Sequence, residues 1–338
     1  MPDARNGTRR AVALRVLALL VSLIVLYFFL PTLGQLFEDW PRLRDLDPIW
    51  IGAAIVFEAA SFACVWWLFA IALQTNKWFA IATSQLAGNA LSRVVPAGAA
   101  AGVTIQYRML AASGVDATAA GSALTASTLL QLATLAALPA LGVLFTIGGR
   151  PIANSLRATA WVGLVAFVVL VGGCVLLAVS DRAVHVVGTF VQSLRNLVLR
   201  KRPPLTDLPT RLRDQRDEVR RALGSHWWES LLATVGNRAL DYFALLACLA
   251  AVGSEPNPGL VLLAYSAAAV LALIPLTPGG LGFVEAGLAA TLVVSGVSGA
   301  DAVLATLAYR LVSFWLPLPV GLAAYLAFRR GQRRHATA

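Results

Sequence analysis

Apolar residues gather along the chain into long runs that short polar or basic stretches separate. Six of these runs are each about 20 residues long, which is the length an α-helix needs to cross the hydrocarbon core of a bilayer. The runs lie at 16–33, 49–73, 117–145, 160–179, 227–252 and 302–328. This pattern predicts six transmembrane helices.

Two further apolar segments are interrupted by proline and glycine. One runs from 79 to 95, is broken at 96–98 and continues from 99 to 113, and the other runs from 260 to 274 and resumes at 287–295. Proline removes a backbone donor and glycine is a poor helix former, so free backbone groups are expected at each break. At membrane depth such groups need protein or a water-filled cavity around them. Both segments are therefore predicted to be re-entrant hairpins or discontinuous helices, and the sequence leaves this choice open.

The two broken segments share two short sequence motifs, separated by the same offset along the chain. In both, P-x-G is followed by S-G-V, and the second copy lies 182 residues after the first. The same offset places 49–73 over the run at 227–252, which indicates an internal duplication, although short words in a biased composition also recur by chance. Three crossings in each half would invert the second half relative to the first, which is a transporter architecture with its site between the repeats.

The expected fold is therefore an all-α integral membrane protein. It would be an inverted-repeat bundle of about six full transmembrane helices plus two re-entrant or discontinuous helices. The expected organisation is a cytoplasmic N-terminus (1–15), a first transmembrane repeat half (16–180), a basic cytoplasmic linker with an amphipathic helix (181–225), the remaining part of the second half (226–328) and a cytoplasmic tail (329–338).

Charge predicts how the chain is oriented. The chain is 58% hydrophobic and carries a formal net charge of +10, with its basic residues at both ends and in the loop 181–224, which holds ten Arg or Lys. By the positive-inside rule, these regions are cytoplasmic in a multi-pass protein of the cell (cytoplasmic) membrane. No nucleic acid is expected as a partner. The loop helix that opens at Asp207 lies either on the inner leaflet surface or in solvent as a linker.

Cysteine and histidine give no sign of metal or redox chemistry. Cys64, Cys174 and Cys248 fall in different apolar runs, and the three histidines are scattered at helix ends or in the tail. No metal-ligand spacing, catalytic triad or phosphate-binding loop is present in the sequence. No metal, no cofactor and no catalytic residue are therefore expected.

Six ionisable residues are predicted to lie near the bilayer centre. An ionised group costs several kcal/mol there unless it is paired or hydrated, so each is a functional candidate. The acids and arginines either neutralise one another or leave arginine available for an anionic headgroup, which guanidinium binds bidentately. Arg238 and Asp241, three residues apart, are expected to pair. The six residues are Glu58, Arg93, Arg238, Asp241, Glu285 and Arg310.

Several stretches of the sequence resemble a known family. PLTPGGLGFVEAGL (275–288), the S-G-V that follows and YRLVSFWLPLPVG (309–321) are similar to the transmembrane region of lysylphosphatidylglycerol synthases, flippase-like proteins also called UPF0104. VVPAGAAAG (94–102) and QYRML (106–110) extend the resemblance to the first half. It implies a membrane domain that moves lipids or lipid-linked sugars between leaflets. Thr128 departs from the pattern, because it stands at the position that matches Arg310.

The expected function is a flippase-like transporter for an anionic phospholipid or a polyprenyl-phosphate-linked sugar. Aminoacyl transfer is not expected, because the soluble transferase domain of the full-length synthases does not follow the last crossing. Membrane lipids and envelope-biosynthesis enzymes are the expected partners. The expected binding residues lie at the two breaks, whose helix N-termini attract anions, and near them. They are Arg93, Pro96, Gly98, Arg108, Pro278, Gly279, Gly280, Glu285 and Arg310.

The sequence leaves two other functions open. The chain could be an integral-membrane lipid- or glycosyl-transferase with Glu58, Asp241 or Glu285 as base, or a non-transporting accessory protein of an envelope-glycolipid pathway. Glu285 either couples protonation to transport or braces its loop.

Overall fold

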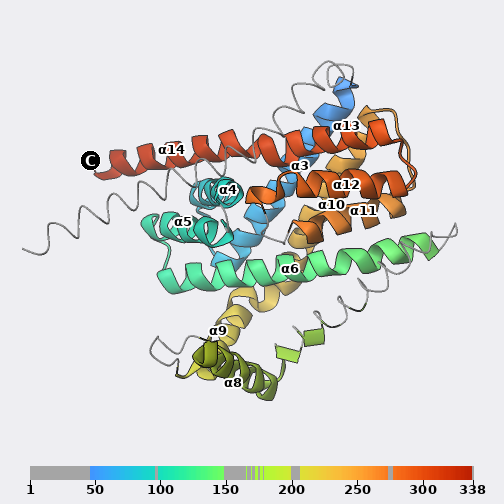
Figure 1. Cartoon of the computed structure of the whole chain (residues 1–338). Helices are drawn as coiled ribbons and strands as arrows, with labels where there is room; N and C mark the ends of the chain where they lie inside the picture. The colour runs from blue at the N-terminus through green and yellow to red at the C-terminus, as the bar shows by residue number, and fades with distance from the viewer. Residues whose placement is uncertain are drawn as a thin grey trace, which may run out of the picture. The chain divides into compact units, whose positions relative to one another are not determined.

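The computed structural model describes 46–95, 98–147, 165, 169, 172–173, 176–177, 179–198, 206–272 and 277–336. Within these ranges every regular element is a helix (Figure 1). The predicted crossing at 16–33 and most of the one at 160–179 lie outside the described residues.

Three helices among the described residues are long and apolar enough to cross a membrane. They are α3 (Pro48–Leu73), α10 (Trp227–Ala251) and the continuous helical stretch Gly299–Arg333. The sequence predicts crossings at 49–73, 227–252 and 302–328, and the structure confirms a long apolar helix at each of these places. Two shorter apolar helices, α11 (Pro258–Leu271) and α12 (Phe283–Val294), flank the second predicted break.

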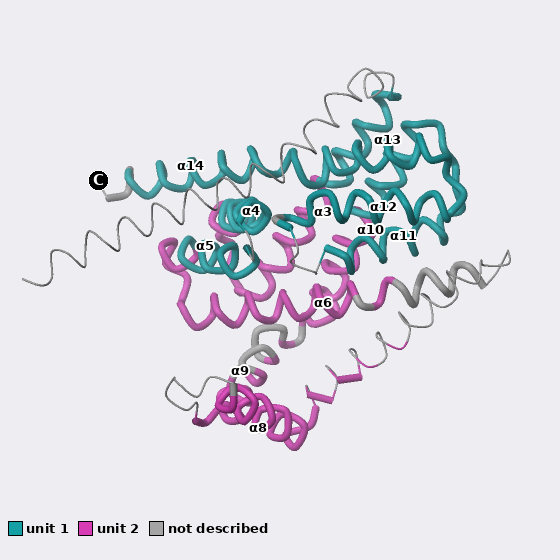
Figure 2. Tube along the Cα trace, viewed as in Figure 1, with its two compact units in different colours: residues 1–58, 82–109, 241–338 teal, residues 59–81, 110–240 magenta. Residues whose placement is uncertain are grey.

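The chain divides into two compact units (Figure 2). Unit 1 consists of 1–58, 82–109 and 241–338, and unit 2 consists of 59–81 and 110–240. The long helices α3 and α10 contribute residues to both units. Each unit is therefore built from segments that are far apart in the sequence.

In unit 1, α12 packs between α11 and α13 (Gly299–Arg310). The short 3-10 turn η2 (Pro278–Gly280) precedes α12, and the π-helical turn η3 (Leu311–Trp315) joins α13 to α14 (Pro317–Ala336). A π-helical turn inside an α-helix often marks a functional site. Here it follows directly after Arg310.

Unit 1 also contains most of α4 (Trp78–Val94) and α5 (Ala99–Ala112), which flank the first predicted break. The two helices approach closely through small residues, because a Cβ added at Gly88 would lie 2.9 Å from the backbone oxygen of Gly102. Such close backbone approach is typical of glycine pairs between membrane helices. Close packing of α4 against α5 therefore accounts for glycine at these two positions.

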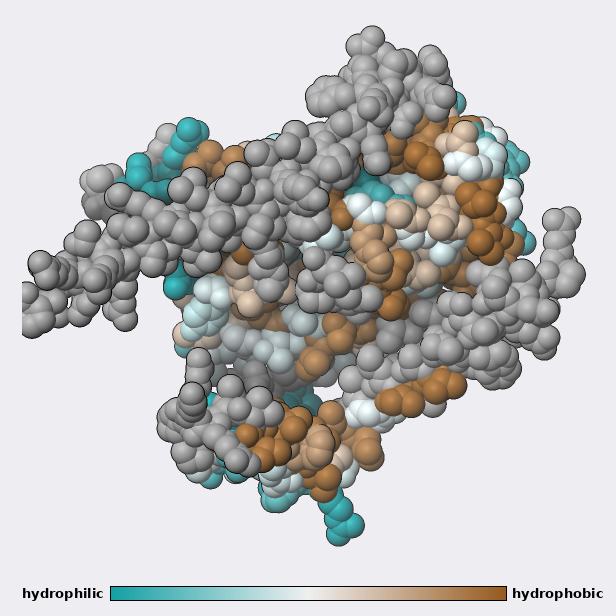
Figure 3. Space-filling view, in the orientation of Figure 1, coloured by the Kyte–Doolittle hydropathy of each residue, from teal (hydrophilic) through white to brown (hydrophobic). Residues whose placement is uncertain are grey.

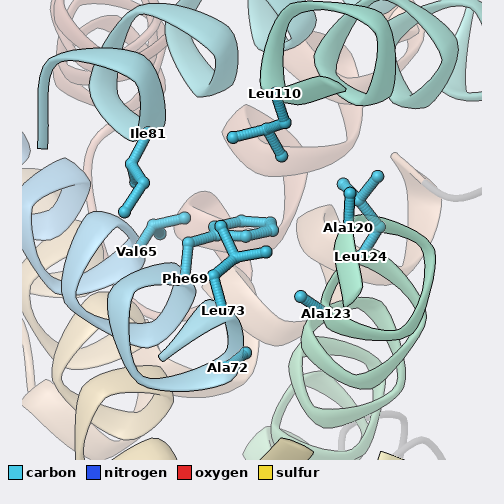
Figure 4. Packing of buried hydrophobic residues seen from close by; sticks show 9 residues of the cluster. All are labelled: Val65, Phe69, Ala72, Leu73, Ile81, Leu110, Ala120, Ala123 and Leu124. Atoms are coloured by element: carbon cyan, nitrogen blue, oxygen red, sulfur yellow. The ribbon is translucent and has the colours of Figure 1, made fainter. Parts of the chain in front are cut away.

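Unit 2 is held by an apolar cluster in which four elements meet (Figure 4). Phe69 of α3 is 5% exposed and lies among small and branched side chains of α3, α4, α5 and α6 (Ala117–Ile147). Ala120 and Ala123 are fully buried, so α6 comes close to the ring. The helix α6 covers the range in which the sequence predicts a crossing at 117–145.

Unit 2 also contains the helical hairpin of α8 (Asp181–Val198) and α9 (Leu208–Leu223). The sequence predicts α9, with its start at Asp207, and the structure confirms that helix. It packs against both α8 and α6. The exposed apolar face belongs instead to α8, where Figure 3 shows a brown surface. It is formed by Val186, Val187, Phe190, Val191, Leu194 and Leu197.

Local structure repeats between the two halves at the predicted offset. Gly114 and Gly296 both have positive φ, of 72° and 95°, and each donates a backbone hydrogen bond of 3.0 Å to a carbonyl three residues earlier. One residue later, the amides of Val115 and Val297 donate to carbonyls five residues back, at 3.2 and 3.1 Å. This is the Schellman arrangement that ends a helix.

The next helix then begins in the same way in both halves. Asp116 accepts from the amide of Ala119 at 2.9 Å, and Ser298 accepts from the amide of Asp301 at 3.2 Å. The S-G-V words are therefore equivalent helix-turn-helix corners, which supports the duplication that the sequence predicts.

Candidate functional site

Five of the six ionisable residues predicted at depth belong to unit 1, and each comes from a different helix. Glu58 lies on α3, Arg93 on α4, Asp241 on α10, Glu285 on α12 and Arg310 on α13. Glu58, Glu285 and Arg310 are buried, with exposed fractions of 7%, 7% and 8%. The fold therefore gathers charges that are distributed over more than 250 residues of sequence.

Arg310 and Glu285 form a buried ion pair. The Nε of Arg310 donates to Oε1 of Glu285 at 2.6 Å, and its Nη2 donates to the carbonyl of Gly279 at 3.1 Å. The guanidinium also stacks on Phe314, with its carbon 4.2 Å from the ring centroid. Arg310 thus connects α13 to the first turn of α12 and to the break before it.

The glycines of the break PGGLG have positive φ. The φ values of Gly279, Gly280 and Gly282 are 61°, 72° and 77°, a region that residues with a Cβ seldom adopt. A Cβ at Gly279 would also overlap the ring of Phe314. The break is therefore a tight turn, and the carbonyl of Gly279 within it faces Arg310.

Arg93 binds backbone groups of the π-helical turn. Its Nη1 donates to the carbonyl of Ser313 and, at 3.1 Å, to that of Phe314. Pro317 has no N–H, so the carbonyl of Ser313 lacks the donor that an α-helix would supply from four residues later. Arg93 supplies that donor from α4 and stabilises the irregular turn.

Asp241 is held by two tyrosines. Its Oδ2 accepts from the hydroxyl of Tyr265 at 2.6 Å, and its Oδ1 accepts from the hydroxyl of Tyr309 at 2.7 Å. The expected pairing with Arg238 is wrong, since no ion pair among the described residues joins the two side chains. The Nε of Arg238 is buried and has no hydrogen-bond partner in the described part of the chain.

Glu58 lies beside this carboxylate. It interacts electrostatically with Asp241 and with Arg93. Its Oε2 is buried without a hydrogen-bond partner among the described residues. Glu58 is therefore the least satisfied acid of the cluster.

The other predicted binding residues have different surroundings. Gly98 is buried in the turn before α5, where a Cβ would overlap the carbonyls of Ser92 and Val95. Arg108 is exposed on α5, and no described hydrogen bond or ion pair links it to the cluster. Pro278 opens η2 beside the cluster, whereas Pro96 lies outside the described residues.

Sequence reasoning missed three aromatic members of the site, namely Tyr265, Tyr309 and Phe314. A signal was available, because a tyrosine inside an apolar run needs a hydrogen-bond partner for its hydroxyl. Tyr309 also directly precedes Arg310. Phe314 contacts both arginines, since Arg93 lies 5.2 Å from its ring centroid.

The cluster places charged side chains in a buried surrounding. Nη1 of Arg310 has no hydrogen-bond acceptor among the described residues, so the guanidinium keeps donors for a further anion. No group of His, Cys, Asp and Glu within the described ranges is arranged to hold a metal ion. These features suit recognition of an anionic group.

Long apolar helices, a broken helix and a charged cluster between several helices define a multi-pass helical membrane protein. A family model of the lysylphosphatidylglycerol synthase transmembrane region matches residues 15–321. The chain belongs to this family.

A curated relative gives the same assignment. The chain is 33% identical over 96 residues to a UPF0104 membrane protein of Methanothermobacter thermautotrophicus (strain Delta H). This match covers 28% of the chain and 27% of the relative. The family and the relative thus confirm the resemblance that the sequence motifs indicate.

Proposed function

We propose that this chain is a flippase-like transporter that moves an anionic lipid, or a lipid-linked sugar, between the leaflets of the cell membrane. The observation that carries the proposal is the buried cluster around Arg310. It places two arginines, one of them with donors still available, beside a broken helix in an apolar helical unit. A phosphate-bearing headgroup is the ligand that such guanidinium groups bind best.

The repeated corners support an architecture of two related halves. Transporters of this kind are often inverted repeats whose discontinuous helices meet near the bilayer midplane. In the proposed arrangement the two halves have opposite orientation and both termini face the cytoplasm. The headgroup crosses along the polar residues while its tails stay in lipid.

An accessory role is the second candidate, and one observation favours it. Arg310 is already neutralised by Glu285, and Arg93 is engaged with backbone carbonyls. If these charges serve only to hold helices together, the cluster has no substrate to bind, as expected for an accessory protein. The two functions differ in whether purified protein accelerates lipid exchange.

The test is leaflet exchange in liposomes that contain the purified protein. Fluorescent phosphatidylglycerol is distributed over both leaflets, and a membrane-impermeant quencher reports what reaches the outer one. The transporter predicts faster exchange than in protein-free liposomes and a loss of that rate in Arg310→Lys, which keeps the charge but not the planar fork. Exchange equal to that of protein-free liposomes would favour the accessory role.

A matched control separates the site from general effects of charge. Arg330 is exposed near the end of α14 and lies outside the cluster. Arg330→Lys should exchange lipid as fast as the unmodified protein. If both substitutions slow exchange equally, the role assigned to Arg310 is wrong.

A further inference from the structure

The cluster of unit 1 contains one acid more than it contains bases. Arg310 is paired with Glu285 at 2.6 Å, and Arg93 and Asp241 contribute one charge of each sign. Glu58 is the remaining ionisable group. With Glu58 ionised the five groups would carry a net negative charge, and with Glu58 protonated their charges cancel.

The position of Glu58 makes that extra charge costly. It lies ten residues after the start of α3, about 15 Å into a helix that rises about 1.5 Å per residue. Its side chain is 7% exposed, and Oε2 has no hydrogen-bond partner among the described residues. An unpaired carboxylate at such depth is strongly disfavoured, whereas a neutral carboxyl is tolerated.

One cation and one acid are among the groups that interact with Glu58, and neither forms a described ion pair with it. Asp241 and Cys248 face it from α10, Arg93 from α4 and Tyr309 from α13. Nη1 of Arg93 donates to carbonyls of the π-helical turn, and no described hydrogen bond joins Arg93 to Glu58. Two neighbouring carboxyl groups repel each other when both are ionised, and this repulsion is absent when one of them carries a proton.

Asp241 is the better satisfied of the two acids. Both of its oxygens already accept hydrogen bonds from tyrosine hydroxyls, so both are satisfied. Glu58, whose Oε2 is buried without a hydrogen-bond partner among the described residues, is therefore the better place for the proton. Glu285 is less suited to this role, since its ion pair with Arg310 would have to open first.

We propose that Glu58 is a proton-binding site and that its proton couples to lipid movement. This inference rests on the proposed transport function. Release of the proton to water leaves two carboxylates side by side, and their repulsion favours a second arrangement of the cluster. Proton binding restores the first arrangement, so the balance between the two states depends on pH.

The proton site is tested without any transport. Infrared spectra of the purified protein distinguish the C=O stretch of a protonated carboxyl from the bands of a carboxylate. We expect a buried protonated carboxyl at neutral pH that is lost in Glu58→Gln and kept in Glu255→Gln, where an exposed loop acid is changed. Absence of the band from the unmodified protein, or its persistence in Glu58→Gln, would overturn the proposal.

The coupling is tested in liposomes by the exchange of phosphatidylglycerol between about pH 5 and about pH 9. A single controlling proton changes the rate by at most about tenfold per pH unit. We expect a pH-dependent rate in the unmodified protein and in Glu255→Gln. The rate in Glu58→Gln should stay constant within about twofold, because glutamine resembles the protonated side chain.

Failures of the two proposals give different results. Equal pH dependence in the unmodified protein and in Glu58→Gln refutes the coupling while transport stands. If the unmodified protein moves no lipid at any pH, the transport function and the coupling are both refuted. The infrared band then still decides whether Glu58 binds a proton.

Discussion

Arg93 donates a hydrogen bond to the carbonyl of Ser313, a residue 220 positions later in the chain. That carbonyl lacks an α-helical donor because residue 317 is proline. The contact therefore joins α4 to an irregularity of the last long helix. It gives Arg93 a structural role at the end of α4.

The first prediction concerns this contact. In Pro317→Ala the new N–H can bond to the carbonyl of Ser313, so the carbonyl no longer depends on Arg93. We expect Arg93→Met to cost less stability in Pro317→Ala than in the unmodified protein, by about 1 kcal/mol for one hydrogen bond. Unfolding free energies in mixed micelles measure the four members of the cycle. If the costs of Arg93→Met and Pro317→Ala simply add, Arg93 does not replace the donor that Pro317 lacks.

The second prediction concerns the ion pair of Arg310 and Glu285. Removal of one partner leaves the other charge buried, so Arg310→Met or Glu285→Gln alone should each destabilise by about 3–5 kcal/mol. The double substitution should cost clearly less than the sum. Arg330→Gln on the exposed end of α14 should change the unfolding free energy by less than about 0.5 kcal/mol. Equal small effects at all three positions would show that the pair is unimportant.

The third prediction contrasts two glycines of unit 1. Gly279→Ala meets both a positive φ and the ring of Phe314, so it should lower the melting temperature. Gly52 lies inside α3 with no atom within 4 Å of an added Cβ. Gly52→Ala should therefore stabilise by up to about 1 kcal/mol through helix propensity. A stabilising effect at Gly279 would contradict the described turn.

The fourth prediction tests the repeat. Gly114 and Gly296 end equivalent helices with positive φ, so alanine at either should cost a similar amount, about 1 kcal/mol. Thermal unfolding of the two variants in the same detergent measures this. A large cost at one corner and none at the other would mean that the two turns are not equivalent.

The fifth prediction concerns pH and the hairpin of α8 and α9. Arg216 donates to Asp181 at 2.6 Å, and this bond lowers the pKa of the Asp181 carboxyl below its ordinary value of 3.8. Because the folded-state pKa is depressed, the stabilisation is complete above that ordinary value. It is lost as the pH falls through the lower, folded-state pKa. Hydrogen exchange of α8 should therefore accelerate in acid in the unmodified protein more than in Asp181→Asn, after correction for intrinsic rates.

Two features of the fold could be predicted from the sequence. The long helices followed from the apolar runs, and the two similar helix corners followed from the S-G-V motif that recurs at one offset. The long helices α3, α10 and Gly299–Arg333 were predictable because a run of that length allows few alternatives. The P-G-G break was predictable because proline and glycine act locally on the backbone. Both kinds of signal are contained in the neighbouring residues.

Partner choice within the cluster was harder to predict. Spacing on α10 suggested that Asp241 pairs with Arg238, but two tyrosines from other helices reach Asp241 instead. The sequence also gave no means to see that Arg93 binds carbonyls of η3. Such contacts depend on tertiary packing, which periodicity does not encode.

The central claim is that the protein moves anionic lipid between leaflets. The most direct measurement compares exchange of labelled phosphatidylglycerol and phosphatidylcholine in one proteoliposome preparation, each relative to protein-free liposomes. We predict that the protein accelerates exchange of phosphatidylglycerol more than that of phosphatidylcholine. No acceleration of either lipid would contradict the transporter, and equal acceleration of both would contradict recognition of the anionic headgroup.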